Sequence, residues 1–262
     1  MNKVCFTASV NFKTIKKFFS SGLNQVKKST EIDVFKQGSK IQLKINNKNL
    51  NKNRKLFFIS EHIFFRNSYN NIISKPTTNI LYKKHIFDSL SISSIFKSFY
   101  SNKKTKYCID FGTGGGFPGL LLSIFFPEVF ISLIDSILRK TNFHVGIVNI
   151  LKLKNCNSIC LRGEKISNSI FHRNKYDIVT SRAVAELAEL LKIFSTISNS
   201  KGKIIIMKKI EGFEKEINNT KNYFSELDFK VKCLIKVDKK KSGKLVILYK
   251  RYRLNKKISN LN

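Results

Sequence analysis

Residues Tyr107–Gly119 read YCIDFGTGGGFPG, and this stretch decides the fold class. Four of its first five residues are apolar and β-rich, which is typical of a short buried strand. Gly112, Gly114 and Gly116 follow directly, where the chain must turn tightly from the strand into a helix. Because the missing side chains let a ligand approach the backbone, the stretch predicts a ligand-binding turn in an α/β sheet.

An acidic residue follows the turn at the end of the next expected strand. Asp135 lies 23 residues after Gly112 and directly after the β-rich run Val129–Ile134. A carboxylate in that place can accept hydrogen bonds from the ribose hydroxyls of a nucleoside cofactor. Phe117 occupies the third glycine position of the dinucleotide pattern G-x-G-x-x-G, which disfavours a diphosphate on the helix start. The pattern fits S-adenosylmethionine better than NAD; an NAD-dependent oxidoreductase and a purely structural turn are the weaker interpretations.

Beyond the turn, β-rich and helical runs alternate along the chain. The expected strands are Tyr107–Phe111, Val129–Ile134, Ser158–Leu161, Tyr176–Thr180 and Lys203–Met207. Helices are expected at Ser136–Leu151, with Ser136 as the N-cap, and at Val184–Ile197. The last two β-rich runs, Val231–Val237 and Leu245–Tyr249, are joined by a polar turn with a glycine and predict a hairpin. The sequence therefore predicts an α/β, Rossmann-like sheet, mostly parallel with an antiparallel C-terminal edge.

Composition divides the chain into four expected parts. Residues 1–55 are basic and predict a flexible or organelle-targeting extension that ends in a solvated loop, Ile41–Lys55. Residues 56–100 carry apolar residues at helical spacing and predict an N-terminal helical cap. The α/β domain that binds the cofactor is expected at 101–252, and a basic tail at 253–262.

The formal net charge of +32 is the strongest signal in the composition. A field of that sign attracts a polyanion such as RNA, so the charge favours a nucleic-acid partner. Lys outnumbers Arg 41 to 8, however, and Asn, Ile and Phe are abundant, which an A/T-rich coding sequence would also produce. Both explanations of the charge stay open at this point.

The cysteines favour a reducing compartment and argue against a metal site. They are odd in number and scattered, without paired C-x-x-C spacing: Cys5, Cys108, Cys156, Cys160 and Cys233. Buried structural thiols are expected ahead of a metal or redox pair. The longest apolar runs fall well short of the roughly 20 residues that cross a bilayer, so no membrane partner is expected.

Five motifs in the same order extend the glycine turn into a family resemblance that covers about residues 60 to 250. They are His85–Leu90, Phe117–Gly119, Asp135-Ser136 with Arg139-Lys140, Arg162–Glu164 and Ser181–Ala183. With them the chain resembles the RsmG (GidB) family. The resemblance implies an S-adenosylmethionine-dependent methyltransferase that modifies N7 of a guanine in small-subunit (16S-type) ribosomal RNA, with 101–252 as the methyltransferase domain.

The resemblance also implies a set of cofactor-binding residues. Joined to those of the turn, they are Gly112, Gly114, Gly116, Phe117, Asp135, Gly163, Glu164 and Arg182. Phe117 can instead be a core residue, and Glu164 a solvated acid. Arg182 follows a strand at its carboxyl end and suits an anion, either the methionine carboxylate of the cofactor or an RNA phosphate. His85 and Asp88 either stitch the cap to the sheet or contact substrate, whereas His62, His144 and His172 are expected at the surface or in packing.

Few catalytic residues are expected for methyl transfer to guanine N7. That nitrogen has a free lone pair, so no base must first remove a proton, and alignment of the reactants can supply up to roughly 7–11 kcal/mol. We therefore nominate no catalytic acid, base or nucleophile. A methyltransferase with another substrate and a non-catalytic RNA-binding assembly factor are the alternatives. The expected setting is a monomer acting on small-subunit ribosomal RNA or 30S-type subunits in a bacterial cytoplasm, or in a plastid or similar organelle.

Overall fold

The computed structural model describes residues 32–37, 40–45, 52–74, 81, 85–86, 88–90, 92–100, 107–182, 185–209, 213–220, 229–236 and 243–250. The chain forms two compact units, residues 1–80 and residues 81–262. The first unit contains a hairpin and a long helix, and the second contains the sheet that the glycine turn predicts. The cap expected at 56–100 therefore has residues in both units.

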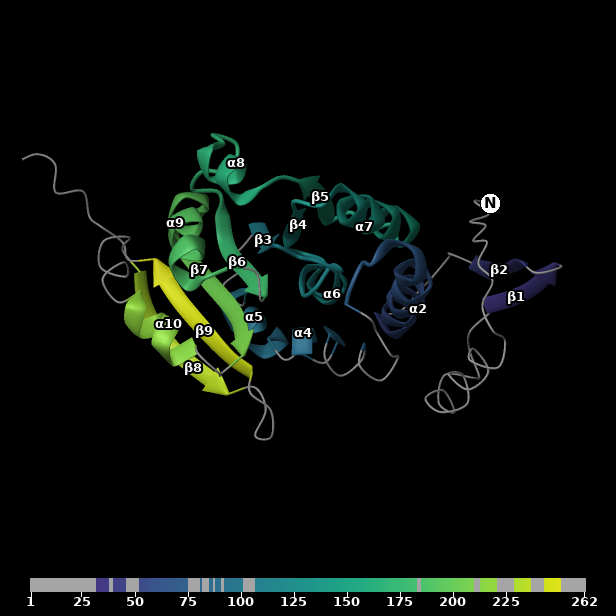
Figure 1. Cartoon of the computed structure of the whole chain (residues 1–262), viewed down its shortest axis with the longest axis horizontal. Coiled ribbons are helices and arrows are strands. Elements are labelled where there is room, and N and C mark those ends of the chain that lie inside the picture. The colour runs from purple at the N-terminus through teal and green to yellow at the C-terminus, as the bar shows by residue number, and fades with distance from the viewer. Residues whose placement is uncertain are drawn as a thin grey trace, which may run out of the picture. The chain divides into compact units, whose positions relative to one another are not determined.

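A seven-stranded sheet forms the centre of the second unit (Figure 1). Its strands, in chain order, are β3 (Tyr107–Phe111), β4 (Phe130–Asp135), β5 (Cys156–Cys160), β6 (Tyr176–Arg182), β7 (Ser198–Lys209), β8 (Phe229–Lys236) and β9 (Gly243–Lys250). The spatial order is β5-β4-β3-β6-β7-β9-β8. Strands β3 to β7 pair in parallel, whereas β9 pairs antiparallel with β7 and β8. The prediction of a mostly parallel sheet with an antiparallel C-terminal edge is confirmed.

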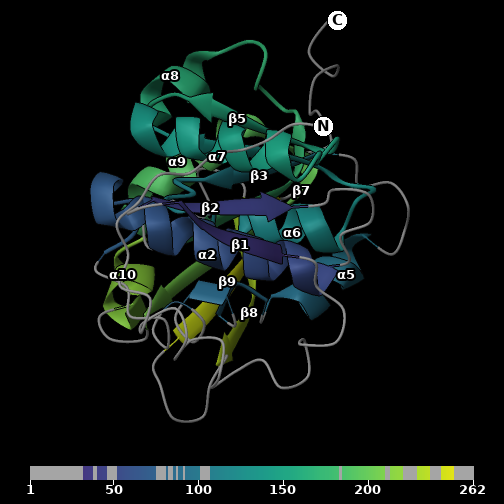
Figure 2. The same ribbon diagram turned by 90° about the vertical axis from the view of Figure 1, so that its right-hand side faces the viewer.

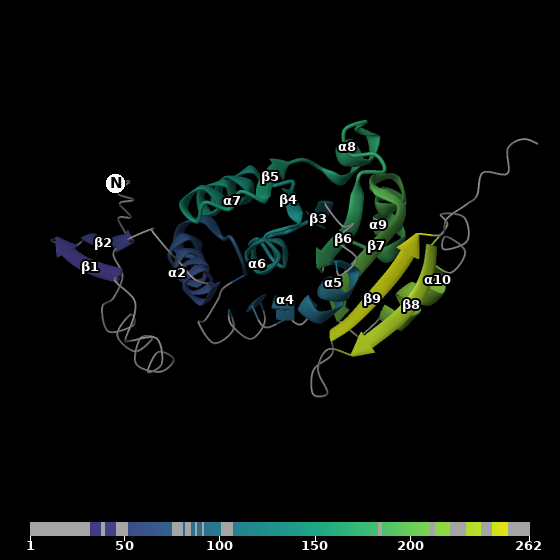
Figure 3. The ribbon, with the colours of Figure 1, turned by 180° about the vertical axis from the view of Figure 1, so that it is seen from behind.

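Helices pack on both faces of the parallel strands (Figures 1 and 3). In the described part of this unit the helices are α4 (Asp88–Leu90), α5 (Ser93–Tyr100), α6 (Gly119–Phe125), α7 (Leu138–Ile150), α8 (Gly163–Asn168), α9 (Leu187–Ile197) and α10 (Phe213–Asn219). Right-handed crossovers place α6 and α9 on opposite faces, because the strand order reverses between β3 and β6. On the α9 face, Leu187, Leu190, Leu191 and Phe194 recur at helical spacing and are fully buried in one apolar cluster.

This reversal of strand order sets the place where a ligand can bind. The chain winds from β3 outward to β5 on one side, then returns to β6 on the other. In open α/β sheets the crevice for ligands lies outside the carboxyl ends of the strands at such a point. The glycine turn leaves the end of β3, Asp135 ends β4 and Arg182 ends β6. The sheet therefore brings three features that the sequence singled out to one edge.

The first unit corrects the expectation of a solvated loop at Ile41–Lys55. Strands β1 (Ile32–Gln37) and β2 (Lys40–Ile45) form an antiparallel hairpin, and α2 (Lys52–Asn70) begins before the expected loop ends (Figure 2). In β2 apolar residues alternate with Gln42 and Lys44, a two-residue period that the Lys- and Asn-rich composition hides. The expected extension before residue 32 and the basic tail at 253–262 lie outside the described residues. Among the described residues, no helix is both long and apolar enough to cross a membrane.

The start of α7 also differs from the prediction. The helix begins at Leu138, and its N-cap residue is Ile137, without a side-chain capping bond, so the assignment of Ser136 as N-cap is wrong. The Asp135 carboxylate accepts the Ile137 backbone N–H at 3.0 Å. Because this bond holds the chain in a turn directly after β4, the helix starts two residues later than expected. Strand β6 likewise extends beyond Thr180, and Arg182 is its last residue.

Candidate functional site

The glycine turn adopts a backbone that other residues rarely tolerate. The φ angles of Gly112, Gly114 and Gly116 are 68°, 60° and 91°, all in the left-handed region. A Cβ on Gly116 would also lie 2.3 Å from Leu120 Cδ1, so packing against α6 independently requires glycine there. A Cβ on Gly114 would meet only the Gly112 carbonyl oxygen, at 4.0 Å. The backbone at Gly114 is therefore open to the approach of a ligand.

Asp110 holds the turn to the sheet. Its carboxylate is fully buried and accepts hydrogen bonds from Thr113 Oγ1 at 2.6 Å, from the Gly119 N–H at 2.8 Å and from Thr180 Oγ1 at 2.9 Å. Burial raises the pKa of Asp110, and these three bonds oppose that shift. The carboxylate thus joins β3, the start of α6 and β6, and fixes both ends of the turn.

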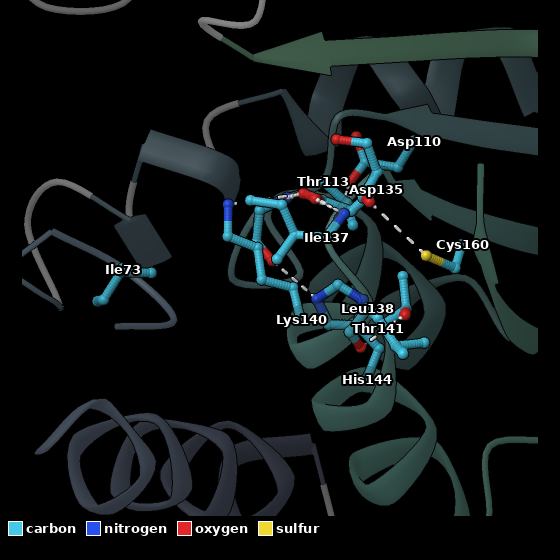
Figure 4. A network of polar contacts seen from close by, with 12 residues as sticks. Ile73, Asp110, Thr113, Asp135, Ile137, Leu138, Lys140, Thr141, His144 and Cys160 are labelled. Carbon is cyan, nitrogen blue, oxygen red and sulfur yellow. Dashed lines mark hydrogen bonds and ion pairs between the residues drawn. The ribbon is translucent and has the colours of Figure 1, made fainter. Parts of the chain in front are cut away.

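Asp135 lies on the other side of the turn (Figure 4). Its Oδ2 accepts the Gly114 N–H at 2.9 Å, and its Oδ1 accepts the Ile137 N–H at 3.0 Å. Lys140 Nζ lies 3.7 Å from Oδ2. An ionised carboxylate has about four acceptor positions, so one on each oxygen remains after the two backbone bonds. Asp135 is therefore oriented by the backbone and can still accept two hydroxyl groups.

His144 belongs to the site, although the sequence predicted it at the surface or in packing. It is fully buried in α7, and its Nε2 lies 2.8 Å from the Gly114 carbonyl oxygen. Its Nδ1 lies 3.2 Å from Ser158 Oγ on β5. Burial lowers the pKa of His144 to about 4, against the opposing effects of the Gly114 bond and Asp135. The ring is therefore neutral at physiological pH. His62 and His172 are also buried, which agrees with a packing role.

Arg182 is held by the segment that the sequence assigned to the cap. Its Nη2 donates to His85 Nδ1 at 2.7 Å, and its Nη1 lies 3.4 Å from Asp88 Oδ2. The guanidinium also lies over the Phe117 ring, 5.5 Å from its centroid, and the His85 ring lies 5.4 Å from the same centroid. Burial raises the pKa of Asp88 and lowers that of Arg182. His85 and Asp88 thus connect their segment to the sheet, and they do so by binding Arg182 at the end of β6.

Two further predicted residues lie at the start of α8, beyond β5. A Cβ on Gly163 would lie 2.7 Å from Ile193 Cδ1 and 3.0 Å from Phe111 Cζ, so a larger residue would require these side chains to shift. Glu164 is exposed in the first turn of α8, with its carboxylate in solvent. Phe117 is 1% exposed and belongs to the core beneath Arg182. These three residues border the site, and their contact with a cofactor stays a prediction.

The cysteines only partly follow the expectation of buried thiols. Cys108 and Cys156 are buried, but Cys160 is exposed at the end of β5. Its Sγ lies 3.7 Å from the Ser136 carbonyl oxygen, because both residues follow neighbouring strands to the same edge. Among the described residues, no group of His, Cys, Asp and Glu side chains could hold a metal ion.

Comparison with known proteins identifies the family. Residues 52–245 match the family model described as GidB, rRNA small subunit methyltransferase G. The chain belongs to this family. Proteins named ribosomal RNA small subunit methyltransferase G from Mesoplasma florum and Clostridium botulinum are 40% and 35% identical to it over 151 and 181 residues. Those alignments cover 58% and 65% of this chain, and 60% and 74% of the relatives. The chain thus spans less than two thirds of the length of the relative from Mesoplasma florum.

A solved structure shows the same fold at low sequence identity. A mutant of MtNAS in complex with S-adenosylmethionine is 12% identical, has a TM-score of 0.50, and is aligned over 76% of this chain and 72% of that one. The match agrees with the fold class that the family predicts for the second unit.

Two residues that position the site in this family member were not predicted as site residues. Asp110 lies within the glycine stretch, and an acid near the end of a buried strand is the sequence signal that could have identified it. His144 offered no comparable signal, because a single His in an amphipathic helix is more often a packing residue. Its role depends on contacts with a turn 30 residues away in sequence, at Gly114.

Proposed function

We propose that this protein transfers a methyl group from S-adenosylmethionine to N7 of a guanine in small-subunit ribosomal RNA. Membership of the family supports the reaction and the class of RNA. One observation carries the assignment to this site: Asp135 is oriented by two backbone N–H groups and keeps acceptor positions beside an open glycine turn. The cofactor supplies an electrophilic methyl group on a sulfonium centre.

The residues at the crevice fit such a cofactor. Asp135 would accept its ribose hydroxyls, and the uncovered backbone at Gly114 would let the ligand approach the turn closely. The turn carries no phosphate-binding pattern, and S-adenosylmethionine has no phosphate. Exposed Ile137 and Leu138 lie two and three residues after Asp135 and would offer apolar surface to the adenine.

The chain's part in catalysis is to hold the two reactants in line. Guanine N7 has a lone pair in neutral RNA, so no residue is required to take a proton before transfer. Rigid placement of the reactants can lower the barrier by up to roughly 7–11 kcal/mol. The bonds that Asp110, on β3, accepts from the turn, from the start of α6 and from β6 supply the rigidity at the turn.

Arg182 would bind an anion at the same edge of the sheet. Its guanidinium is a planar fork of N–H donors that suits a carboxylate, and His85, Asp88 and Ser89 hold it in place. The methionine carboxylate of the cofactor is the anion that we assign to it, since Arg182 ends β6 beside the β3 turn. The formal charge of +32 on the whole chain would then attract the RNA at longer range.

The assignment can be tested with the full chain and undermodified small subunits. Methyl transfer from labelled S-adenosylmethionine, followed by mass mapping of the RNA, reports the substrate, the base and the atom together. We expect a single 7-methylguanine and RNA binding that weakens with salt. No transfer, despite tight binding of both ligands, would instead indicate a non-catalytic assembly factor.

Asp135→Ala provides the residue-level test. Loss of the carboxylate removes both ribose bonds, and we expect cofactor affinity to fall about a hundredfold, or about 2.7 kcal/mol. Asp135→Asn is the matched control, because it keeps the shape and one acceptor oxygen. Its cofactor affinity should lie between those of the wild type and the Ala variant. Unchanged affinity of the Ala variant in calorimetry would remove the cofactor from this site.

A further inference from the structure

We propose that His144 is a positioning residue of the cofactor site, which locks Gly114 so that Asp135 stays oriented for the ribose. The inference rests on the proposed function, because it assigns a role within that same site. His144 does not contact the reacting atoms in this scheme. It acts through the backbone of the turn.

The two polar groups of Gly114 are both bonded to side chains. Its N–H donates to Asp135 Oδ2 at 2.9 Å, and its carbonyl oxygen lies 2.8 Å from His144 Nε2. The N–H belongs to the peptide plane before the Gly114 Cα, and the carbonyl belongs to the plane after it. The two bonds together therefore fix both backbone dihedral angles of a residue that, as glycine, has the widest conformational freedom.

The chemistry of the partners determines which nitrogen of His144 carries the proton. A carbonyl oxygen can only accept, so Nε2 must be the N–H donor to Gly114. Nδ1 is then the acceptor in the neutral ring, and the Ser158 hydroxyl donates to it across 3.2 Å. Ser158 thus selects the tautomer that serves the turn. A neutral ring also agrees with complete burial, because a charged one would be costly to bury beside Lys140.

This contact joins three elements at the point where the cofactor would lie. His144 belongs to α7, Ser158 to β5 and Gly114 to the turn after β3 (Figure 4 shows His144 and Asp135). Without the imidazole, the Gly114 carbonyl would lose its partner, and the following peptide plane could rotate. The ψ angle of Gly114 would then be unrestrained, and the bond from its N–H to Asp135 would alone hold this part of the turn. A turn held only on that side can shift, and Asp135 would keep one of its two orienting bonds less firmly.

His172 provides a matched control within the same unit. It is also buried, and its Nδ1 lies 2.7 Å from the Tyr176 hydroxyl. Tyr176 is the first residue of β6, whereas the proposed crevice lies at the opposite, carboxyl ends of the strands. Loss of this imidazole should therefore affect folding without affecting the cofactor. A difference between the two histidines separates positioning from packing.

The test compares four variants of the full chain: His144→Leu, His144→Gln, Ser158→Ala and His172→Phe. For each we would measure S-adenosylmethionine affinity by calorimetry, the melting temperature without ligand, and hydrogen exchange of the peptide that contains Gly114. We expect His144→Leu to weaken affinity about tenfold, or about 1.4 kcal/mol, and to speed exchange in the turn. The KM for the cofactor should rise by the same factor, with kcat changed less than about twofold.

The other variants make the outcome decisive. His144→Gln offers an amide N–H to Gly114 and should recover most of the affinity, while Ser158→Ala should weaken it about threefold. His172→Phe should lower the melting temperature and leave affinity unchanged. If His144→Leu lowers only the melting temperature, the residue is a packing residue and the proposal is wrong. Should that variant not fold, unchanged affinity in Ser158→Ala overturns the proposal. Failure of the wild-type chain to bind the cofactor would instead refute the proposed function.

Discussion

The ends of two neighbouring strands, β3 and β4, each offer a carboxylate to the same glycine turn, and the two are used differently. Asp110 is 0% exposed, and its three hydrogen bonds all go to the protein's own donors. Asp135 is 7% exposed and has two backbone donors, which leaves acceptor positions at the open side of the turn. The fully buried carboxylate of Asp110 is used to hold the site together, whereas that of Asp135 keeps acceptor positions that a ligand could use.

The difference also appears in what each acid does to the turn. Asp110, on β3, accepts bonds from Thr113 in the turn, from Gly119 at the start of α6 and from Thr180 on β6, so it determines where the turn lies. Asp135 contacts the middle of the turn at Gly114, where a Cβ would meet nothing closer than 4.0 Å. Removal of the first acid should therefore affect folding, whereas removal of the second should affect ligand affinity.

The largest expected effect is that of Asp110→Ala on stability. Three buried donors would lose their acceptor, and we expect the free energy of unfolding to fall by about 3–5 kcal/mol, as when one partner is removed from a buried charged network. Urea unfolding measures the change. Thr113→Val removes only one of the three bonds and should lower the free energy of unfolding by about 1 kcal/mol. A loss below 1 kcal/mol for Asp110→Ala would mean that the acid does not hold the turn.

The sequence predicted most of the fold because the β-rich runs alternate strongly with helical ones. Strand β3 has the predicted bounds, and the order of strands from β3 to β9 follows the prediction. The boundaries failed where a side chain makes a bond that periodicity cannot reveal. The Asp135 carboxylate accepts the Ile137 N–H, so α7 begins later than predicted. Strand β2 was missed for another reason, because abundant Lys and Asn hid its two-residue apolar period.

The sequence predicted the motifs of the site but not the long-range contacts that hold them in place. Asp135 and the glycines follow from spacing, since both lie at strand ends that a parallel sheet brings together. The contacts of Arg182 with His85 and Asp88 span more than 90 positions of the chain, and no local pattern specifies them. The cofactor contact of Gly163 stays a prediction, and its close neighbours Ile193 and Phe111 add a packing constraint that only the tertiary structure reveals.

The second expected effect is a loss of stability at low pH, caused by His144, which contacts the glycine turn at Gly114. His144 has a pKa of about 4 in the fold and an ordinary value of 6.5. Below 6.5 the unfolded chain takes up a proton that the folded chain refuses, so stability falls as pH falls, until the folded form also protonates near pH 4. Between pH 7 and pH 5 this should cost about 2 kcal/mol.

The pH effect of His144 can be isolated by difference. The free energy of unfolding of the wild type and of His144→Leu should be measured by urea at both pH values. Glu61, whose pKa burial raises to about 7, and His62, whose pKa burial lowers to about 4, titrate in both proteins and cancel in the comparison. The Leu variant should lose less stability than the wild type over this range. Equal losses would show that His144 is already accessible to protons in the fold.

The smallest expected effect tests whether Asp135 is oriented by the backbone or by its ion pair. Lys140 Nζ lies 3.7 Å from Asp135 Oδ2, which is too far for a hydrogen bond, so the ion pair orients the carboxylate less than the two backbone bonds do. Lys140→Met keeps the aliphatic stem and removes the charge, and we expect cofactor affinity to change by less than about threefold, or roughly 0.6 kcal/mol. Calorimetry at two salt concentrations measures it, with Arg139→Met, which alters an exposed charge one position away, as the control. A drop as large as that of Asp135→Ala would assign the orientation of the acid to Lys140, and the bonds from Gly114 and Ile137 would then be a consequence of the ion pair.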